Sequence, residues 1–140
     1  MTRDEILALC ERRQEAFDRA DLEALAPLYA DTAVLNSPMT GIAMGRDAVV
    51  KATGAFFAAF PDAKVVAEPP LIDGGRVAIL AEVSGTHNGA LMALPPSGKP
   101  FRFKVVFALE VADHHIVNER RIYDFTGLLV QIGVLKAKPA

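Results

Sequence analysis

The sequence has no tryptophan, a single cysteine, and little excess charge of either sign among its 140 residues. The lone Cys10 excludes an internal disulfide and is typical of a reducing compartment, so we expect a cytoplasmic protein. The formal net charge is −2, and no basic cluster is larger than the pair Arg120–Arg121. Nucleic-acid binding requires a concentrated basic face, so this class of function is not expected.

Long apolar runs are also missing. No charge-free stretch approaches the roughly 20 residues that a membrane-spanning helix needs, and the charged N-terminal segment does not resemble a signal peptide. Hydrophobic residues nevertheless make up 51% of the chain, enough for a core and a pocket, which argues against disorder. The length and the lack of a linker predict one domain over residues 1–140.

The first part of the chain predicts helices. Thr2 and Glu5 have the spacing of a capping box, and apolar residues then recur at intervals of three and four positions. A shorter helix follows Asp21, and a third ends near Phe60, before Pro61-Asp62. A brief strand at 33–37 and a turn-rich segment at 39–45 lie between them.

From Ala63 onward the apolar period changes to two, which predicts strands at 63–68, 77–87, 101–110 and 116–124. Helices first and antiparallel strands afterward predict an α+β fold, in which the helices pack against one face of a curved sheet. A short helix or turn is expected at 126–132.

His87 has the same parity as the apolar positions of the second of these strands, so it is expected to point inward. It is then either a hydrogen-bonded structural group or a pocket acid/base, and a bulge at the flanking glycines would reverse its direction. The three histidines show no metal-ligand spacing, and no glycine-rich phosphate loop is present. We therefore expect neither a metal nor an organic cofactor.

The most informative segment is 118–125. Alternation places Asn118, Arg120, Ile122 and Asp124 on one face and Glu119, Arg121 and Tyr123 on the other, so both faces carry charge. One of them must place polar groups against the interior, a pocket or a partner subunit. A buried carboxylate has a raised pKa and can transfer protons near neutrality, which makes Asp124 a candidate. Asp124 would alternatively cap the terminal segment.

Four short stretches carry a family resemblance. They are 60–62 (Phe-Pro-Asp), 85–89 (Gly-Thr-His-Asn-Gly) with 94–99 (Leu-Pro-Pro-Ser-Gly-Lys), 116–120 (Ile-Val-Asn-Glu-Arg), and 123–133 with its Tyr-Asp, Leu-Leu and Gln-Ile-Gly. In this order and spacing the chain resembles the SnoaL-like branch of the nuclear transport factor 2-like superfamily, which includes polyketide and ester cyclases.

The resemblance implies a cone-shaped fold in which a bent sheet wraps the helices around a deep apolar pocket. It also implies cofactor-free, metal-free aldol cyclisation, with an aspartate of the last strand as general acid/base; Asp124 is the matching position. Relatives on this fold isomerise ketosteroids or hydrolyse epoxides. The Arg-x-Asp pair of the epoxide hydrolases is absent from the inner strands of this sequence, and no second acid suits an isomerase.

The leading hypothesis is a cyclase or isomerase acting on a small apolar carbonyl compound, with Asp124 and His87 as catalytic residues. The other residues expected at the pocket are Asn36, Arg120, Tyr29, Phe57, Phe103 and Phe107. An ion pair between Arg120 and Asp124 would lower the aspartate pKa and weaken it as a base. The alternative is a non-catalytic binding or assembly module, whose interior the phenylalanines would fill. Apolar residues on the outer strand face, including Val106 and Ala108, favour a homodimer.

Overall fold

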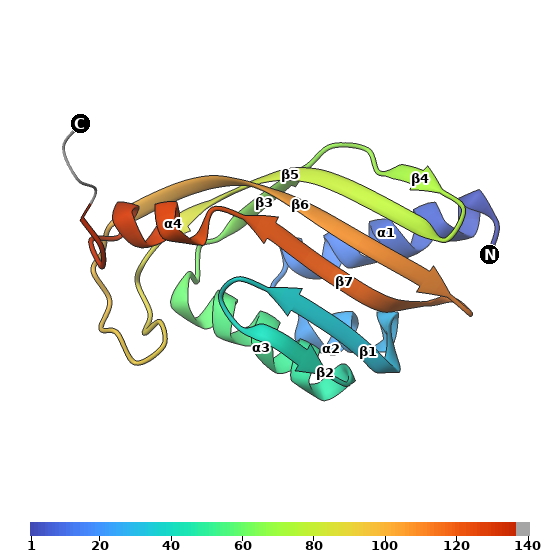
Figure 1. The fold of residues 1–140 in the computed structure, drawn as a ribbon, viewed down its shortest axis with the longest axis horizontal. Coiled ribbons are helices and arrows are strands. Elements are labelled where there is room, and N and C mark those ends of the chain that lie inside the picture. Colours follow the sequence, from blue (N-terminus) through green and yellow to red (C-terminus); the bar gives the residue numbers. More distant parts are fainter. Residues whose placement is uncertain (137–140) are drawn as a thin grey trace.

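The computed structural model of the protein describes residues 1–136. A seven-stranded sheet lies at its centre. Six of its strands follow the order β2-β1-β7-β6-β5-β3, and the seventh, β4, pairs with residues 76–78 at the start of β5. The strands are β1 (Tyr29–Ser37), β2 (Gly41–Met44), β3 (Lys64–Ala67), β4 (Leu71–Asp73), β5 (Arg76–Thr86), β6 (Pro100–Ala112) and β7 (His115–Tyr123). Figure 1 shows how the long strands β5, β6 and β7 cross the molecule side by side.

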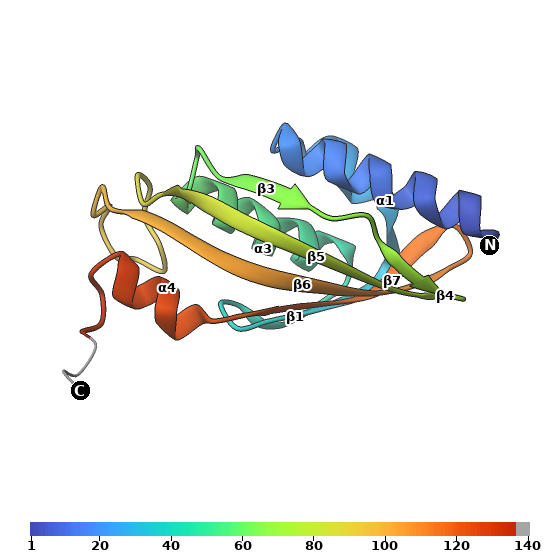
Figure 2. The same ribbon diagram turned by 90° about the horizontal axis from the view of Figure 1, so that it is seen from above.

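The helices are α1 (Arg3–Asp18), α2 (Leu22–Leu25) with the 3-10 turn η1 (Ala26–Leu28), α3 (Arg46–Ala59) and α4 (Phe125–Gln131). The Thr2 hydroxyl accepts a hydrogen bond from the Glu5 amide at 3.1 Å, which confirms the predicted cap of the first helix. Figure 2 shows α1 and α3 on the same side of the sheet, while α4 lies beyond the end of β7. The core lies between these two helices and the concave side of the sheet.

The alternation read from the sequence is confirmed in β5 and β6. The two strands pair continuously from Arg76 opposite Glu110 to Thr86 opposite Pro100. Their odd-numbered apolar side chains are buried: Val77, Ile79, Ala81, Val83, Phe101, Phe103, Val105, Phe107 and Leu109. One face of this pair therefore forms the floor of the core.

The predicted α+β fold with a curved sheet is confirmed, with two differences. The segment expected to be only a turn contains β2, which forms a hairpin with β1. In addition, β1 runs parallel to β7, so the sheet is mixed. This pairing brings residues 34–36 beside residues 118–120 and extends the sheet beyond β7. Within the described residues, no helix has the length and apolarity that a membrane crossing would need.

Candidate functional site

A β-bulge in β7 decides which residues reach the interior. The hairpin between β6 and β7 begins with Ala112 opposite His115 and Val111 opposite Ile116, but Glu110 then pairs with Asn118. Val117 is the extra residue, and it shifts the rest of the strand by one position. Leu109, Phe107 and Val105 therefore lie opposite Glu119, Arg121 and Tyr123. Because directly paired residues share a face, these three polar side chains point into the core.

Two of them, Arg121 and Tyr123, border a pocket between the helices and the sheet. It is lined by Phe17, Ser37, Met39, Thr40, Ala52, Thr53, Phe56, Phe57, Val65, Val83, Phe103, Val105, Phe107, Arg121 and Tyr123. The walls are mostly aromatic and aliphatic, with polar groups at only a few points. This is the composition of a small-molecule site.

The pocket is narrow in this conformation. The space open to the centres of water-sized molecules is about 40 Å³. A single water needs roughly 10–15 Å³ by this measure, so there is room for only a few. Met39, Phe56 and Phe57 line the pocket and are only half-buried. A ring-sized ligand would therefore enter by moving these side chains.

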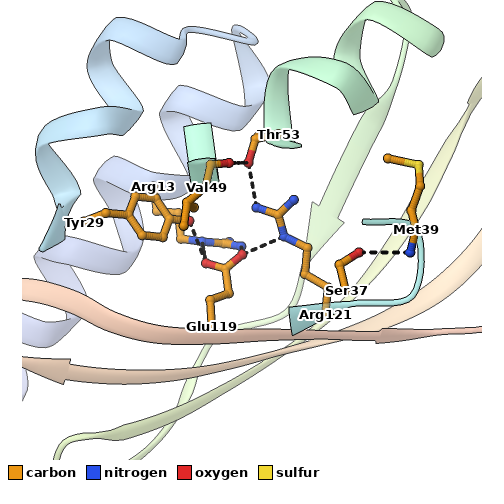
Figure 3. A network of polar contacts seen from close by, with 8 residues as sticks. All are labelled: Arg13, Tyr29, Ser37, Met39, Val49, Thr53, Glu119 and Arg121. Atoms are coloured by element: carbon orange, nitrogen blue, oxygen red, sulfur yellow. Dashed lines mark hydrogen bonds and ion pairs between the residues drawn. The ribbon is translucent and has the colours of Figure 1, made fainter. Parts of the chain in front are cut away.

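A buried ionic network forms one end of the site (Figure 3). Glu119, which is fully buried, accepts hydrogen bonds from Arg13 Nε and Nη2, both at 3.1 Å. The Tyr29 hydroxyl donates to the same carboxylate at 2.6 Å, and Arg121 Nε donates to it at 2.7 Å. Arg121 Nη2 also donates to the Thr53 hydroxyl at 2.9 Å. The network thus joins α1, β1, α3 and β7.

The charges within the network fix its protonation states. Burial alone would raise the pKa of Glu119, but the guanidinium groups of Arg13 and Arg121 outweigh it and lower this pKa to about 2. Burial and the Glu119 charge raise the pKa of Tyr29 to about 12, so this phenol stays neutral and donates. Glu119 is therefore a permanent anion near neutrality, and a carboxylate held so firmly ionised is a poor proton carrier.

Tyr123 provides the other polar group of β7 at the pocket. Burial raises the pKa of its phenol above the usual value, against hydrogen bonds with Ser37 and the Met39 backbone that lower it. The phenol is accordingly neutral near neutrality and can donate a hydrogen bond. Arg121 and Tyr123 together place two groups that can donate hydrogen bonds in the lining of an apolar pocket.

Three of the residues predicted for the pocket line it: Phe57, Phe103 and Phe107. Tyr29 does not line it; its hydroxyl binds Glu119, which in turn binds Arg121 of the lining. Asn36 and Arg120 are exposed, which contradicts the prediction that they face the pocket. Arg120 borders a shallow hollow on the outer face of the sheet, and it forms no salt bridge with Asp124.

The prediction that Asp124 faces the pocket is wrong. The bulge turns its strand face outward, and Asp124 is exposed at the N-cap of α4. Its Oδ1 accepts a hydrogen bond from the Gly127 amide at 2.8 Å. The capping alternative considered from the sequence therefore describes its position, and Asp124 does not line the pocket.

His87 points inward as predicted and is fully buried, but it lies outside the pocket lining. Its Nδ1 accepts a hydrogen bond from the Ser97 amide at 3.1 Å and lies 2.9 Å from the Ser97 hydroxyl. Its ring packs against Phe60, with 5.9 Å between ring centroids. These contacts fix the 87–99 loop, so they support the structural interpretation of His87.

Sequence reasoning missed Arg13, Glu119, Arg121 and Tyr123. One signal was present: Arg13 falls on the apolar stripe of the first helix, where a charged residue requires a buried partner of opposite sign. The bulge at Val117 gives no comparable pattern in the sequence. Within residues 1–136, no group of three or more His, Cys, Asp or Glu side chains is arranged to hold a metal ion.

The model of the SnoaL-like polyketide cyclase family matches residues 8–132. AclR of Streptomyces galilaeus, a proposed hydroxylase, is 26% identical with a TM-score of 0.83, over 99% of this chain and 87% of its own. IdmH of Streptomyces antibioticus, a proposed polyketide cyclase, is 30% identical with a TM-score of 0.76, over 90% and 96%. TerC, co-crystallised with polyporic acid, shares the fold at 11% identity, with a TM-score of 0.75 over 91% and 98%. None of the curated proteins matches the chain.

Proposed function

Because this chain belongs to the SnoaL-like polyketide cyclase family, we propose that it is a cofactor-free enzyme of the cyclase or isomerase type. Its substrate would be a small apolar carbonyl compound bound in the pocket beside Arg121 and Tyr123. The observation that carries the proposal is the pairing of an apolar cavity with these two inward donors. Donors fixed in a water-poor site stabilise negative charge that develops on a substrate oxygen.

The common first step of cyclisation and isomerisation is loss of a proton next to a carbonyl. The C–H bond breaks, and its electron pair moves onto the carbonyl oxygen to give an enolate. The enolate carbon then either attacks a second carbonyl, which forms a C–C bond and an alkoxide that is protonated, or regains a proton at another position. Arg121 and the neutral Tyr123 phenol would stabilise the enolate oxygen.

The proton acceptor in this scheme is water. Among the described residues that line the pocket, there is neither a carboxylate nor an imidazole. The pocket would therefore act chiefly by lowering the pKa of the substrate C–H bond, which suits a 1,3-dicarbonyl compound that is already acidic at carbon. This differs from the aspartate mechanism expected from the sequence.

The test is exchange of the acidic protons of an aryl 1,3-diketone such as benzoylacetone in deuterated water, followed by NMR. The wild-type protein should accelerate exchange over buffer, and Tyr123→Phe or Arg121→Met should each lower the rate by about a hundredfold. Arg120→Met is the matched control, because Arg120 lies next in sequence but is exposed on the outer face. No acceleration by the wild-type protein, across a panel of such diketones, would contradict the proposed chemistry.

A non-catalytic ligand-binding module of the same fold is the second candidate. The lack of a proton acceptor in the described lining and the narrow cavity favour it. The TerC complex with polyporic acid supports small-molecule binding in a protein of this fold. Binding of the diketones without faster exchange would identify this alternative as the correct one.

We also propose that the protein is a cytoplasmic homodimer. Leu80, Val106 and Ile122 are directly paired across three strands on the outer face, and Leu80 and Ile122 are 40% and 56% exposed. Burying this row against a second copy would remove apolar surface from water. Light scattering should give twice the 15.0 kDa chain mass, and Ile122→Glu should yield the monomer. A wild-type mass of one chain would contradict the dimer.

The proposed cytoplasmic location is supported by Cys10, which is buried and forms no disulfide, as is typical of a reducing compartment.

A further inference from the structure

The ionic network carries one positive charge in excess. It contains the guanidinium groups of Arg13 and Arg121 but only one carboxylate, that of Glu119. The neutral Tyr29 phenol adds no charge. Within residues 1–136, Glu119 is the acidic partner of both arginines, and no second acid approaches either of them.

The two arginines are not equivalent. Arg13 is 1% exposed, binds both oxygens of Glu119, and lies between two rings, with its guanidinium carbon 4.2 Å from the Phe17 centroid and 4.3 Å from that of Phe107. Arg13 is thus enclosed by Glu119 and the two rings, and it does not line the pocket. Of the two arginines, only Arg121 is placed to present the excess positive charge to a ligand in the pocket.

Arg121 is placed to present that charge to the pocket. Its side chain is 11% exposed, and it lines the cavity. Nε is bonded to Glu119 and Nη2 to Thr53, while Nη1 makes no hydrogen bond with the described residues. In Figure 3 this second terminal nitrogen points away from Glu119, toward the side where Ser37 and Met39 lie.

A guanidinium in apolar surroundings whose N–H donor has no acceptor lacks a partner for part of its charge. Charge in a low-dielectric site is costly unless it is paired, and a charge-assisted hydrogen bond to an anion is stronger than one to a neutral acceptor. The rest of the pocket wall is mainly aromatic and aliphatic, and it includes the rings of Phe17, Phe56, Phe57 and Phe103. The site therefore combines one cationic donor with surfaces that suit a flat apolar body.

From this charge imbalance we infer that the ligand of the pocket is a compact aromatic or otherwise flat apolar anion, whose negatively charged oxygen binds Arg121 Nη1. A carboxylate and an ionised enol present the same chemistry to the guanidinium. The inference rests on the proposal that this pocket is the ligand site, but it does not depend on catalysis.

The test compares acids with neutral partners of the same shape. Binding of benzoate and benzamide, and of the ionised cyclic 1,3-diketone dimedone and its enol methyl ether, is measured by NMR titration at neutral pH. Wild-type protein should bind each anion at least about tenfold more tightly than its neutral partner. The diketone pair and the carboxylate pair show which source of the anion the site prefers.

Three variants locate the effect. Arg121→Met should abolish the preference, because it weakens binding of the anions at least about tenfold more than binding of the neutral partners, and Arg121→Lys should retain part of it. Arg120→Met should leave the preference intact. If Arg121→Met does not fold, the anion inference is still tested by the ratio of anion to neutral affinity in the wild-type protein and in Arg121→Lys.

The outcomes separate the two proposals. Equal binding of anions and neutral partners would overturn the anion inference, while ligand binding at the pocket would stand. A preference that survives in Arg121→Met would overturn it as well. Anion-selective binding without diketone proton exchange would support the inference and contradict only the proposed catalysis.

Discussion

Replacement of Glu119 by glutamine is the sharpest perturbation of this structure. The carboxylate accepts four hydrogen bonds from Arg13, Tyr29 and Arg121, and it is 0% exposed. Glutamine keeps the shape but loses the charge, and its NH2 group would face donors instead of accepting from them. Arg13 would remain buried without a counter-ion.

The magnitude follows from the loss of one partner of a buried ion pair, which costs about 3–5 kcal/mol. For a chain of this length each kcal/mol corresponds to roughly 3–4 °C in Tm, so the midpoint should fall by about 9–20 °C. Urea unfolding followed by circular dichroism should show a lower midpoint with an unchanged slope.

The matched control is Glu82→Gln. Glu82 pairs with Arg102 on the surface, where the two side chains are 37% and 71% exposed. An exposed pair contributes about 0–1 kcal/mol, so this variant should be nearly neutral. A double-mutant cycle with Arg13→Met should give a coupling energy of about 1–3 kcal/mol with Glu119. A loss below about 1 kcal/mol in Glu119→Gln would refute the assignment of a buried, ionised carboxylate.

Three other parts of the structure can be tested in the same way. Since the pKa of Glu119 is about 2 when folded and its ordinary value is 4.5, its stabilising effect is complete above about pH 4.5 and is lost as the pH falls toward 2; acid titration of unfolding should be flatter in Glu119→Gln. Asp124→Ala should lose about 1 kcal/mol because the Gly127 amide loses its cap, whereas Asp124→Asn should keep both stability and any activity; inactivity of a folded Asn variant would restore a catalytic role. Gly89→Ala should be expressed misfolded or strongly destabilised, because a Cβ there would lie 1.8 Å from the Ala58 carbonyl oxygen; a normal melting curve would contradict this packing.

The sequence predicted the fold well because its periodicities are local. The alternation of 101–110 identifies which side chains of β6 are buried, without any knowledge of its neighbours. The helix caps at Thr2 and Asp21 are likewise visible as short patterns, and both form. The residues that specify each of these elements lie within the element itself.

The site could not be predicted in the same way, because it depends on register. A two-residue hairpin without a bulge would have placed Arg120, Ile122 and Asp124 inward, and Arg120 and Asp124 were accordingly expected at the pocket. One extra residue, Val117, reverses this choice and exchanges an inward Asp124 for an inward Glu119 and Arg121. Both strand faces carry charge, so hydrophobic patterning alone could not decide between the two registers.

The buried network itself argues for a role in binding. Replacing a buried ion pair by well-packed apolar residues of similar volume is often neutral or stabilising, so stability alone does not require Arg13 and Glu119. The network does position Arg121. Glu119 and Thr53 together hold its guanidinium at the pocket wall and leave Nη1 available to a ligand. If Glu119 were paired with Arg121 alone, the two charges would cancel and the pocket would present a neutral pair. Because Arg13 shares the single Glu119 charge, the network keeps a net positive charge, and Arg121 is the donor that faces the ligand in the pocket.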